Sequence, residues 1–392
     1  MKSIKDELNL SEKKILLRLD LNVPLDNGKI IDTTRIDKII PTISFLLKND
    51  AKIIILSHVG RPKGKIMNEL SLKPICEDLK NKLNVDIKLI TKNIKDIKSV
   101  DLFNNQNEKV VMLENIRFCK EEENNNTEFA KHLASLADIY VNDAFSCSHR
   151  AHASIFEITK FLPSYAGLQL NLEVNALTRI TSEIKRPITC IIGGSKISSK
   201  INIIKNLIPK FNNIIIVGGM ANNILKYKGH NIGRSIQEDN CDKIIEEIFS
   251  LSKKEGCKII YPEDVVVSKS LNGLGETKSL DDIFEDELIL DIGPKSIKII
   301  KNLVDASNTL FWNGPAGYFE NPDFAKGSVE IGKKIVEKNK TTTFYSVAGG
   351  GDTVALLNGM KAIDSFNFVS TAGGAFLEYL EGKELPGIKA LN

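Results

Sequence analysis

The chain has 392 residues, of which 42% are hydrophobic and 26% charged, and its formal net charge is +3. This length predicts two or three domains, and the composition excludes a disordered, collagenous or disulfide-scaffold class. The near-balanced charge argues against nucleic acid or a membrane surface as a partner. Six scattered cysteines without a C-x-x-C pair suit free thiols in a reducing compartment. Because the charged N-terminus lacks a signal-peptide core and no apolar run approaches the ~18 residues of a membrane span, we expect a cytoplasmic protein.

Apolar, β-branched runs alternate with helical stretches through the first half of the chain. Residues 32–50 place Ile36, Ile39 and Ile43 at helical spacing, and residues 71–83 also predict a helix. Such alternation is typical of a parallel sheet that helices cover on both faces. The predicted strands of this half lie within residues 14–24, 51–62, 109–118 and 137–154.

The second half repeats this pattern, and five of its six apolar runs continue directly into glycines. Ligands bind at the carboxyl ends of parallel strands, where glycine lets the backbone approach them closely. Residues 162–187 predict a connecting helix that ends at Arg186 and Pro187, and the sequence EEENNN at 121–126 predicts a solvated loop. The predicted strands of this half lie within residues 188–194, 213–219, 257–267, 309–315, 342–351 and 366–374.

Basic and polar side chains follow each predicted strand of the first half. If the sheet is parallel they meet at one edge, and several arginines with histidines suit a small, multiply charged phosphate or carboxylate. A single arginine at such a position is more often an ordinary surface residue, and Asp20 alone is equally compatible with a metal ligand or a general base. The residues concerned are Arg18, Asp20, Asn22, Arg35, His58, Arg61, Arg117, His149, Arg150 and His152.

The glycine loops of the second half indicate a phosphate site of an unusual kind. Neither G-x-x-x-x-G-K-[ST] nor a complete G-x-G-x-x-G after a strand occurs, which excludes P-loop NTPases and simple dinucleotide dehydrogenases. The segment GGSKISSK predicts Lys196 and Lys200 in the first turn of a helix, where cations are unfavourable unless an anion binds. Asp352 also opens a predicted helix, either as an N-cap or as a Mg²⁺ ligand beside a phosphate. Two α/β halves, one with an anion pocket and one with a phosphate site, predict a phosphotransferase.

At these residues the sequence resembles the phosphoglycerate kinase family, and the resemblance covers essentially the whole chain. Its motifs occur in the family's order, and several are highly specific. They are RLDLNVP (18–24), SHVGRPKG (57–64), LENIRF (113–118), HRAHAS (149–154), GGSKISSK (193–200), VGGMAN (217–222), WNGPAGYFE (312–320), GGGDTVA (349–355), STAGGA (370–375) and LPGIKAL (385–391).

The resemblance implies two Rossmann-like, three-layer αβα domains with parallel sheets. Residues 1–168 would bind phosphoglycerate, 169–186 would form the connecting helix, and 187–379 would bind the nucleotide, with the tail 380–392 packing back on the first domain. The implied reaction is reversible phosphoryl transfer between 1,3-bisphosphoglycerate with MgADP and 3-phosphoglycerate with MgATP, in line and after hinge closure. The enzyme would act as a monomer in glycolysis, with Mg²⁺ as cofactor and no nucleic-acid or membrane partner.

The resemblance also assigns roles to individual residues. Arg35 and Lys196 would be catalytic, and Asp352 would hold Mg²⁺ together with the nucleotide phosphates. The implied phosphoglycerate ligands are Asp20, Asn22, Arg35, His58, Arg61, Arg117 and Arg150. The implied nucleotide ligands are Lys200, Gly219, Gly293, Asn313, Glu320, Gly350, Gly351, Asp352 and Thr353.

The chain departs from the family pattern next to the nucleotide residues. Ser199 stands where the family usually has aspartate, Ala372 where a third glycine is usual, and Ala316 and Tyr318 replace commoner aliphatic residues; the connector 167–177 also differs. Two alternatives remain: a catalytically inactive metabolite-binding protein on this fold, and a kinase for another acyl phosphate such as acetyl phosphate. Retention of the arginine and lysine set argues against the first, and the many basic groups of the first half argue against the second.

Overall fold

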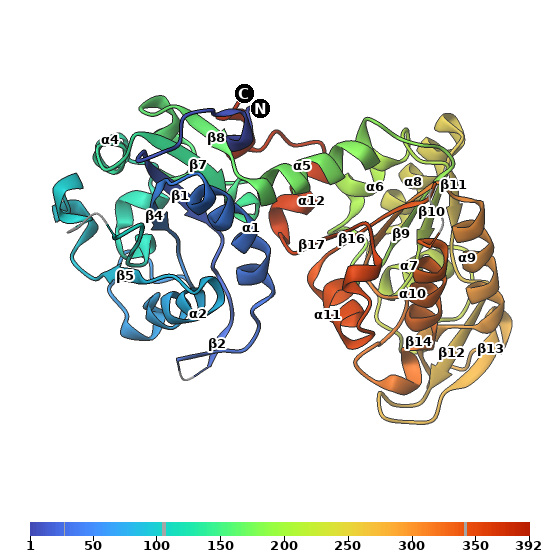
Figure 1. Cartoon of the computed structure of the whole chain (residues 1–392). Coiled ribbons are helices and arrows are strands. Elements are labelled where there is room, and N and C mark those ends of the chain that lie inside the picture. The colour runs from blue at the N-terminus through green and yellow to red at the C-terminus, as the bar shows by residue number, and fades with distance from the viewer. Residues whose placement is uncertain (27, 104–106, 341–342) are drawn as a thin grey trace. The chain divides into compact units, whose positions relative to one another are not determined.

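A computed structural model describes residues 1–26, 28–103, 107–340 and 343–392 of the chain. It divides into two compact units, one formed by Met1–Asn175 with Glu384–Asn392 and the other by Ala176–Lys383 (Figure 1). We call them unit 1 and unit 2. No helix within the described residues has the length and apolar character needed to cross a membrane.

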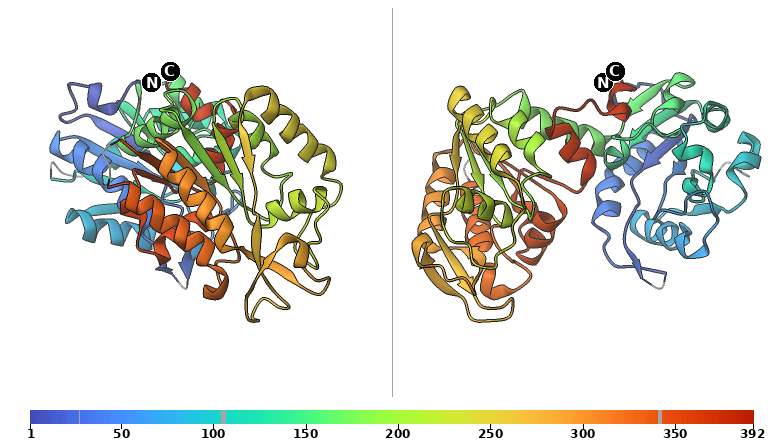
Figure 2. Two further views of the ribbon diagram at one scale, coloured as in Figure 1. Left: turned by 90° about the vertical axis from the view of Figure 1, so that its right-hand side faces the viewer. Right: turned by 180° about the vertical axis from the view of Figure 1, so that it is seen from behind.

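Unit 1 contains a six-stranded parallel sheet in the order β5-β6-β4-β1-β7-β8. Helices pack on both of its faces (Figure 2). The strands are β1 (Lys14–Leu19), β4 (Lys52–Leu56), β5 (Ile87–Ile90), β6 (Val110–Leu113), β7 (Ile139–Asp143) and β8 (Ser164–Ala166), and a short hairpin adds β2 (Leu25–Asp26) and β3 (Lys29–Ile30). The helices are α1 (Thr34–Lys48), α2 (Lys73–Leu83), α3 (Lys120–Glu123), α4 (Thr127–Ala134) and the C-terminal α13 (Pro386–Lys389).

The apolar runs of unit 1 become strands because both faces of the sheet are buried. Along β1, Ile15 and Leu17 belong to the hydrophobic cluster that includes α1 and α2, whereas Leu16 belongs to the opposite cluster, which includes α4. Side chains alternate between the faces of a strand, so a run that is apolar at every position fits only a sheet covered on both sides.

Unit 2 contains a second six-stranded parallel sheet, in the order β11-β10-β9-β15-β16-β17, and a separate antiparallel sheet in the order β13-β12-β14. The parallel strands are β9 (Ile188–Ile192), β10 (Asn213–Ile216), β11 (Lys258–Ile260), β15 (Thr309–Asn313), β16 (Tyr345–Gly349) and β17 (Phe368–Ser370). The antiparallel strands are β12 (Asp264–Ser268), β13 (Glu276–Ser279) and β14 (Leu288–Ile292). The helices are α6 (Ile201–Leu207), α7 (Gly219–Tyr227), α8 (Asp242–Glu255), α9 (Pro294–Ala306), α10 (Lys326–Lys338), α11 (Gly351–Gly359) and α12 (Gly374–Leu380).

Two predicted elements are divided differently in the structure. Residues 257–267 were expected to form one strand, but Pro262 separates β11 of the parallel sheet from β12 of the antiparallel sheet. The connector 162–187 contains the strand β8 followed by the helix α5 (Leu168–Thr181), which ends before Arg186. The predicted strand that begins at residue 342 starts outside the described residues, and β16 begins at Tyr345.

Asp143, at the end of β7, holds the N-terminal end of α5. Its Oδ1 accepts a hydrogen bond of 2.8 Å from the Leu170 N–H, and its Oδ2 accepts one of 2.5 Å from the Thr42 hydroxyl. Burial raises the pKa of this carboxyl to about 6, although the hydrogen bonds from Thr42 and Leu170 oppose the shift. The C-terminal segment also packs on unit 1, where the Gly387 N–H donates to the Ser148 carbonyl at 2.8 Å.

The segment EEENNN is only partly the solvated loop that its composition predicts: Asn124 and Asn126 are exposed and lie outside a helix, but the first half of the segment differs. Residues 120–123 form α3, and the side chain of Glu122 is completely buried. Its carboxylate accepts hydrogen bonds from the Ser154 hydroxyl at 2.7 Å and from the Ser154 N–H at 2.9 Å. These long-range partners compensate the cost of burying a carboxylate.

Candidate functional site

The polar and basic side chains predicted to bind the substrate follow the four central strands of the unit 1 sheet. Asp20 and Asn22 follow β1, His58 and Arg61 follow β4, Arg117 follows β6, and Arg150 follows β7. Because neighbouring parallel strands end at the same edge, the topology brings these loops to one rim of the sheet. We call this set, with Arg35 at the start of α1, the unit 1 rim.

Asp20 and Arg35 form an ion pair at the centre of this rim. The Arg35 Nη1 lies 2.8 Å from Asp20 Oδ2 and 3.1 Å from Oδ1, and it also donates to the Asn22 carbonyl at 3.2 Å. The Ser146 hydroxyl, from the loop after β7, donates to the same Asp20 carboxylate at 2.5 Å. Asp20 therefore fixes a guanidinium at the rim and joins the loops after β1 and β7.

The loop after β4 is fixed by side chains from two other loops. The Asn22 Oδ1 accepts a hydrogen bond of 2.9 Å from the Gly60 N–H, and Arg117 Nη1 donates to the Gly60 carbonyl at 3.0 Å. Arg117 Nε also lies 3.4 Å from Glu123. Arg117 is buried, with 5% of its surface exposed, and this burial lowers the pKa of its guanidinium.

His58 is nearly buried and is held by Arg18. The Arg18 Nη2 lies 3.2 Å from His58 Nδ1, and because arginine only donates, Nδ1 must accept. Burial and the neighbouring Arg18 and Arg117 charges lower the pKa of His58 well below its usual range. Burial and the same two arginines lower the pKa of His152 to about 3. These shifts favour the neutral form of both histidines, in which they can offer hydrogen bonds to an anion.

Two rim arginines are more accessible. Arg61 is exposed in the loop after β4. Arg150 is half-buried, and its Nε lies 3.1 Å from His149 Nε2. The structure thus connects Asp20, Asn22, Arg35 and Arg117 through direct bonds or the shared Gly60, and leaves Arg61 at the surface.

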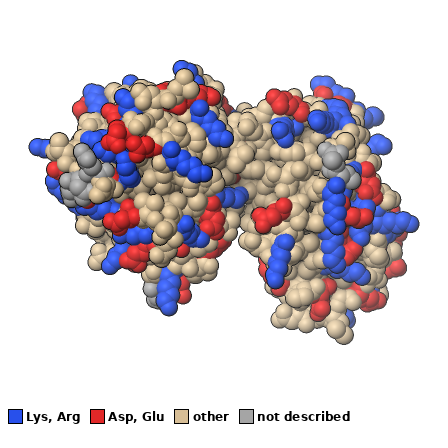
Figure 3. All heavy atoms as spheres, in the orientation of Figure 1, with Lys and Arg blue, Asp and Glu red and all other residues tan. Residues whose placement is uncertain are grey.

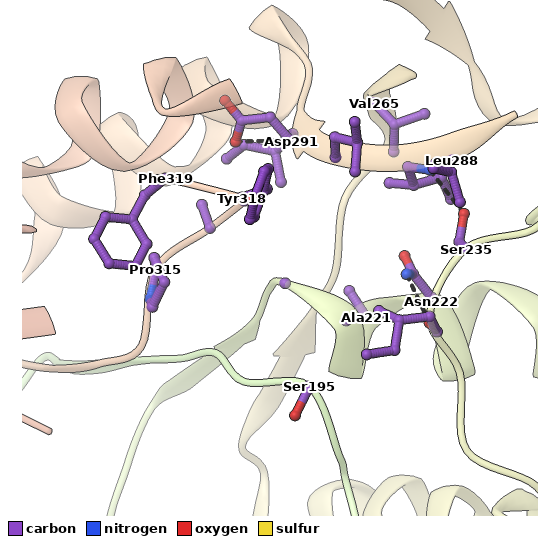
Figure 4. A pocket seen from close by; sticks show the side chains of 18 of the residues that line it. Ser195, Ala221, Asn222, Ser235, Val265, Leu288, Asp291, Pro315, Tyr318 and Phe319 are labelled. Carbon is purple, nitrogen blue, oxygen red and sulfur yellow. Dashed lines mark hydrogen bonds between the residues drawn. The ribbon is translucent and has the colours of Figure 1, made fainter. Parts of the chain in front are cut away.

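Unit 2 contains a cavity of about 500 Å³ with mostly apolar walls (Figure 4). Three of the predicted nucleotide residues line it: Gly219, Glu320 and Asp352. Gly219 is the first residue of α7, and a Cβ at this position would lie 2.7 Å from Ile236, so a side chain here would crowd the cavity wall. The size and apolar lining fit the base and sugar of a nucleotide.

Sequence reasoning missed much of the wall of this cavity. Val265 of β12 and Leu288 of β14 contribute from the antiparallel sheet, and Asn222 and Ser235 lie at the same opening (Figure 4). Pro262, which breaks the apolar run before Val265, is the signal that could have separated this sheet from the parallel one.

Lys200 and its neighbours form the polar end of the nucleotide region. Lys200 Nζ lies 2.9 Å from Asn313 Oδ1, and Asn313 Nδ2 donates to the Gly349 carbonyl at 2.6 Å. Burial lowers the pKa of Lys200, whereas the nearby Asp352 carboxylate opposes that shift. A ligand anion that reached Lys200 would therefore meet a partly desolvated cation.

The glycines before α11 keep this end open. Gly350 has φ of 98°, and a Cβ there would lie 2.6 Å from Asn313 Nδ2, so other residues would be strained. The Thr353 hydroxyl accepts the Gly314 N–H at 2.6 Å, and Gly351 has nothing within 4 Å of the position a Cβ would take. Gly293, another predicted nucleotide ligand, is not among the residues that line the cavity, whereas the adjacent Ile292 is. A Cβ at Gly293 would lie 2.3 Å from Asp264.

The lysine segment is not arranged as expected. The helix α6 begins only at Ile201, with Lys200 at its N-cap, so Lys196 lies in the preceding loop rather than in a first helical turn. Lys196 is exposed, and the loop around it is held by Ser198, whose N–H donates to Glu238 at 3.0 Å. Lys196 was expected to be destabilised by the dipole of a following helix unless an anion binds. This expectation does not hold, because the effect of the dipole is limited to the first turn and Lys196 lies before it.

The residues that depart from the family pattern cause no visible distortion. The Ser199 hydroxyl donates to the Lys196 carbonyl at 2.7 Å. Ala372 lies outside the left-handed region, so its Cβ brings no backbone strain. Ala316 is buried with its N–H bonded to Ser328 at 2.8 Å, and Tyr318 lines the cavity.

An arginine-rich rim on one α/β unit and a nucleotide-sized cavity with a phosphate-type loop on another define a phosphotransferase. The family model for phosphoglycerate kinase matches residues 5–383. The chain is 43% identical to the phosphoglycerate kinase of Chelativorans sp. (strain BNC1) over 394 residues, covering 100% of this chain and 98% of that protein. It is also 43% identical to that of Wolbachia pipientis subsp. Culex pipiens (strain wPip), with 98% of each covered.

Solved structures agree with these sequence relatives. The phosphoglycerate kinase of Coxiella burnetii superposes with a TM-score of 0.91 at 38% identity, covering 99% of this chain and 98% of that one. That of Pyrococcus horikoshii OT3 gives a TM-score of 0.80 at 27% identity, covering 100% and 98%. The chain belongs to the phosphoglycerate kinase family. It is a glycolytic kinase that transfers a phosphoryl group reversibly between 1,3-bisphosphoglycerate with ADP and 3-phosphoglycerate with ATP.

Proposed function

We propose that the two units divide the substrates, with 3-phosphoglycerate bound at the unit 1 rim and the nucleotide in the unit 2 cavity. The observation that carries this proposal is the fixed arginine arrangement of the rim, in which Asp20 orients Arg35 and the Gly60 carbonyl orients Arg117. Guanidinium groups held in advance bind a doubly charged phosphate and a carboxylate at a reduced entropic cost. Asn22, His58, Arg61 and Arg150 complete this binding set.

In unit 2, Gly219, Glu320 and the neighbourhood of Gly293 would frame the adenosine. Lys200, Asn313, Gly350, Gly351 and Thr353 would then meet the phosphates. Lys200 supports this arrangement because it is half-buried, its ammonium bonds Asn313, and Asp352 lies near enough to affect its pKa. All three residues belong to unit 2. A nucleotide phosphate would replace the water that this cation has lost.

Mg²⁺ would be held by Asp352 together with the nucleotide phosphates. The carboxylate of Asp352 is exposed, lies in the first turn of α11 and lines the cavity, and oxygen ligands of this kind suit Mg²⁺. Magnesium in such sites takes one or two carboxylates and completes its shell with phosphate and water. When bound, the ion would neutralise charge on the phosphates.

Catalysis would depend on positive charge around the transferred group rather than on a covalent step. Arg35 would supply that charge from the phosphoglycerate side and Lys196 from the nucleotide side. Because the two substrates bind to different units, transfer requires hinge closure that brings them in line and excludes water. We further propose that the enzyme is a cytoplasmic monomer.

Acceptor specificity tests the proposal. Purified enzyme with ATP and Mg²⁺ should phosphorylate 3-phosphoglycerate. A coupled assay of ADP formation should show little activity with glycerate or acetate, which lack the C3 phosphate that the rim arginines would bind. Comparable activity with acetate would favour a kinase for another acyl phosphate. Nucleotide binding without turnover of any acceptor would favour a metabolite-binding protein.

A further inference from the structure

A chain of hydrogen bonds runs inside unit 1 from α3 to the rim. It begins at the fully buried Glu122, whose Oε1 accepts from the Ser154 hydroxyl at 2.7 Å. The same hydroxyl oxygen accepts from Arg18 Nε at 2.9 Å, and Arg18 Nη2 donates to His58 Nδ1 at 3.2 Å. Two buried side chains, Ser154 and Arg18, thus connect a carboxylate to a histidine of the proposed substrate site.

The direction of each hydrogen bond follows from the donors available. Arginine has no acceptor, so both Ser154 Oγ and His58 Nδ1 must accept from Arg18. The Ser154 hydroxyl is then left to donate to Glu122. Since Nδ1 accepts, a neutral His58 carries its proton on Nε2 and can offer that proton to an anion.

The charges around this chain make the Glu122 carboxylate its anchor. Arg18 is fully buried, and its charge acts on Arg117 and His152 in the same interior. The Ser154 hydroxyl bridges it to the Glu122 carboxylate, which compensates that charge. His152 Nδ1 lies 3.7 Å from Glu122 Oε1 and is itself neutral near pH 7. Burial raises the pKa of Glu122, while Arg18 and the two Ser154 hydrogen bonds oppose that shift.

We propose that Glu122 is a positioning residue for phosphoglycerate binding, which acts through Ser154 and Arg18 to hold His58 in its Nε2–H tautomer. The proposal rests on the substrate-binding role of His58 given above. Without the chain, Arg18 loses its acceptor at Nε and, besides His58, keeps only the Leu19 carbonyl and the Cys147 sulfur as partners among the described residues. Its guanidinium can then shift relative to His58, whose ring samples both tautomers. The affinity for 3-phosphoglycerate should fall, whereas the nucleotide site in unit 2 should not respond.

The first experiment reads the tautomer directly, without substrate. Nitrogen-15 NMR of histidine-labelled enzyme should show an unprotonated Nδ1 and a protonated Nε2 for His58, assigned among the chain's five histidines by the signal lost in His58→Gln. Both Glu122→Gln and Ser154→Ala should shift these two signals toward a tautomer mixture. Glu157→Gln is the matched control, because Glu157 is a buried carboxylate of unit 1 that bonds Thr127 and Lys160 instead.

The second experiment separates binding from general damage. In both variants the KM for 3-phosphoglycerate should rise roughly three- to tenfold, the loss of part of one hydrogen bond, while kcat and the KM for ATP change less than about twofold. Ser154→Ala keeps both buried charges in place, so it provides the measurement if Glu122→Gln fails to fold. Unchanged His58 signals in Ser154→Ala, or equal rises of both KM values, would overturn the proposal. If the His58 signals of the wild type did not change on addition of 3-phosphoglycerate, His58 would not bind the substrate. That result would refute the proposed role of His58 and the expected effect of Glu122 on binding.

Discussion

Replacing Arg61 by alanine tests the division of substrates between the units, because Arg61 is the exposed member of the rim arginines. A hydrogen bond between charged groups contributes about 1.5–3 kcal/mol, so the Kd for 3-phosphoglycerate should rise roughly ten- to hundredfold. The Kd for ATP, for which we propose a site in unit 2, should change less than about twofold. Isothermal titration calorimetry with each ligand separately measures both quantities.

Stability distinguishes this variant from a matched one in the same site. Loss of the Arg61 side chain uncovers no buried partner, so the free energy of unfolding without ligand should change by less than about 0.5 kcal/mol. Arg117→Ala should instead cost about 1–3 kcal/mol of unfolding free energy, because its buried side chain bonds the Gly60 carbonyl and lies near Glu123. Denaturant titration of the two variants measures this contrast.

The reasoning about Arg61 has two ways to fail. Equal losses of affinity for 3-phosphoglycerate and ATP would show that the substrates are not divided between the units as proposed. A loss of stability in Arg61→Ala as large as in Arg117→Ala would show that the exposed side chain supports the fold, and its effect on binding could not then be assigned to contact with the substrate.

Three further predictions concern the nucleotide loop and the connector helix. Lys196→Met should lower kcat by roughly three to five orders of magnitude in steady-state kinetics, with both KM values moving less than about tenfold. It should leave thermal stability unchanged, because Lys196 lies outside α6. A variant that kept more than about a tenth of the wild-type kcat would refute the catalytic role of Lys196. Ser199→Asp should remain active and change ATP affinity less than Lys200→Ala does, since Ser199 bonds its own loop; calorimetry compares the two. Asp143→Asn should flatten the pH dependence of the unfolding free energy between about pH 4 and 6. The pKa of Asp143 is raised from 3.8 to about 6, so its contribution is fully present below pH 3.8 and is lost as the pH rises through 6, by about 3 kcal/mol, which denaturant titrations at each pH would reveal.

The parallel sheets were predictable because their signal is local. In the run Lys14–Leu19, four of the six residues are apolar and three of them, Ile15 to Leu17, are consecutive, a pattern that fits a strand buried on both faces. The same holds for β9 and β15, all of whose residues are buried. Glycines follow β9 and β15 and mark the edge where the loops can approach a ligand, and basic side chains mark the corresponding edge in unit 1. The places of the two sites remain predictions from these patterns.

The failures have a different physical origin, because they depend on partners far away in the sequence. Glu122 lies among acidic and amide residues, and this local composition predicts that it is exposed to solvent. Its burial is possible because Ser154 donates hydrogen bonds to it and the charge of Arg18 is close. The start of α6 depends on how Glu238 holds the preceding loop at Ser198, which no local pattern around Lys196 records. A residue whose environment is supplied by another segment cannot be placed by periodicity or composition.

The two sites present positive charge in different ways, and this difference bears on catalysis. In unit 1, Arg35 is tied to Asp20 and Arg117 to the Gly60 carbonyl, so these guanidinium groups are oriented before the substrate arrives. In unit 2, Lys196 is exposed, and water screens its charge in the free enzyme. Fixed cations favour binding of the ground state, whereas a cation that loses its water only when the substrates meet acts mainly on the transition state. We therefore expect substitutions at Arg61, Arg117 and Arg150 to appear mostly in KM for 3-phosphoglycerate and those at Lys196 mostly in kcat. Substitution of Arg35, which is proposed both to bind the substrate and to stabilise the transferred group, should change both constants.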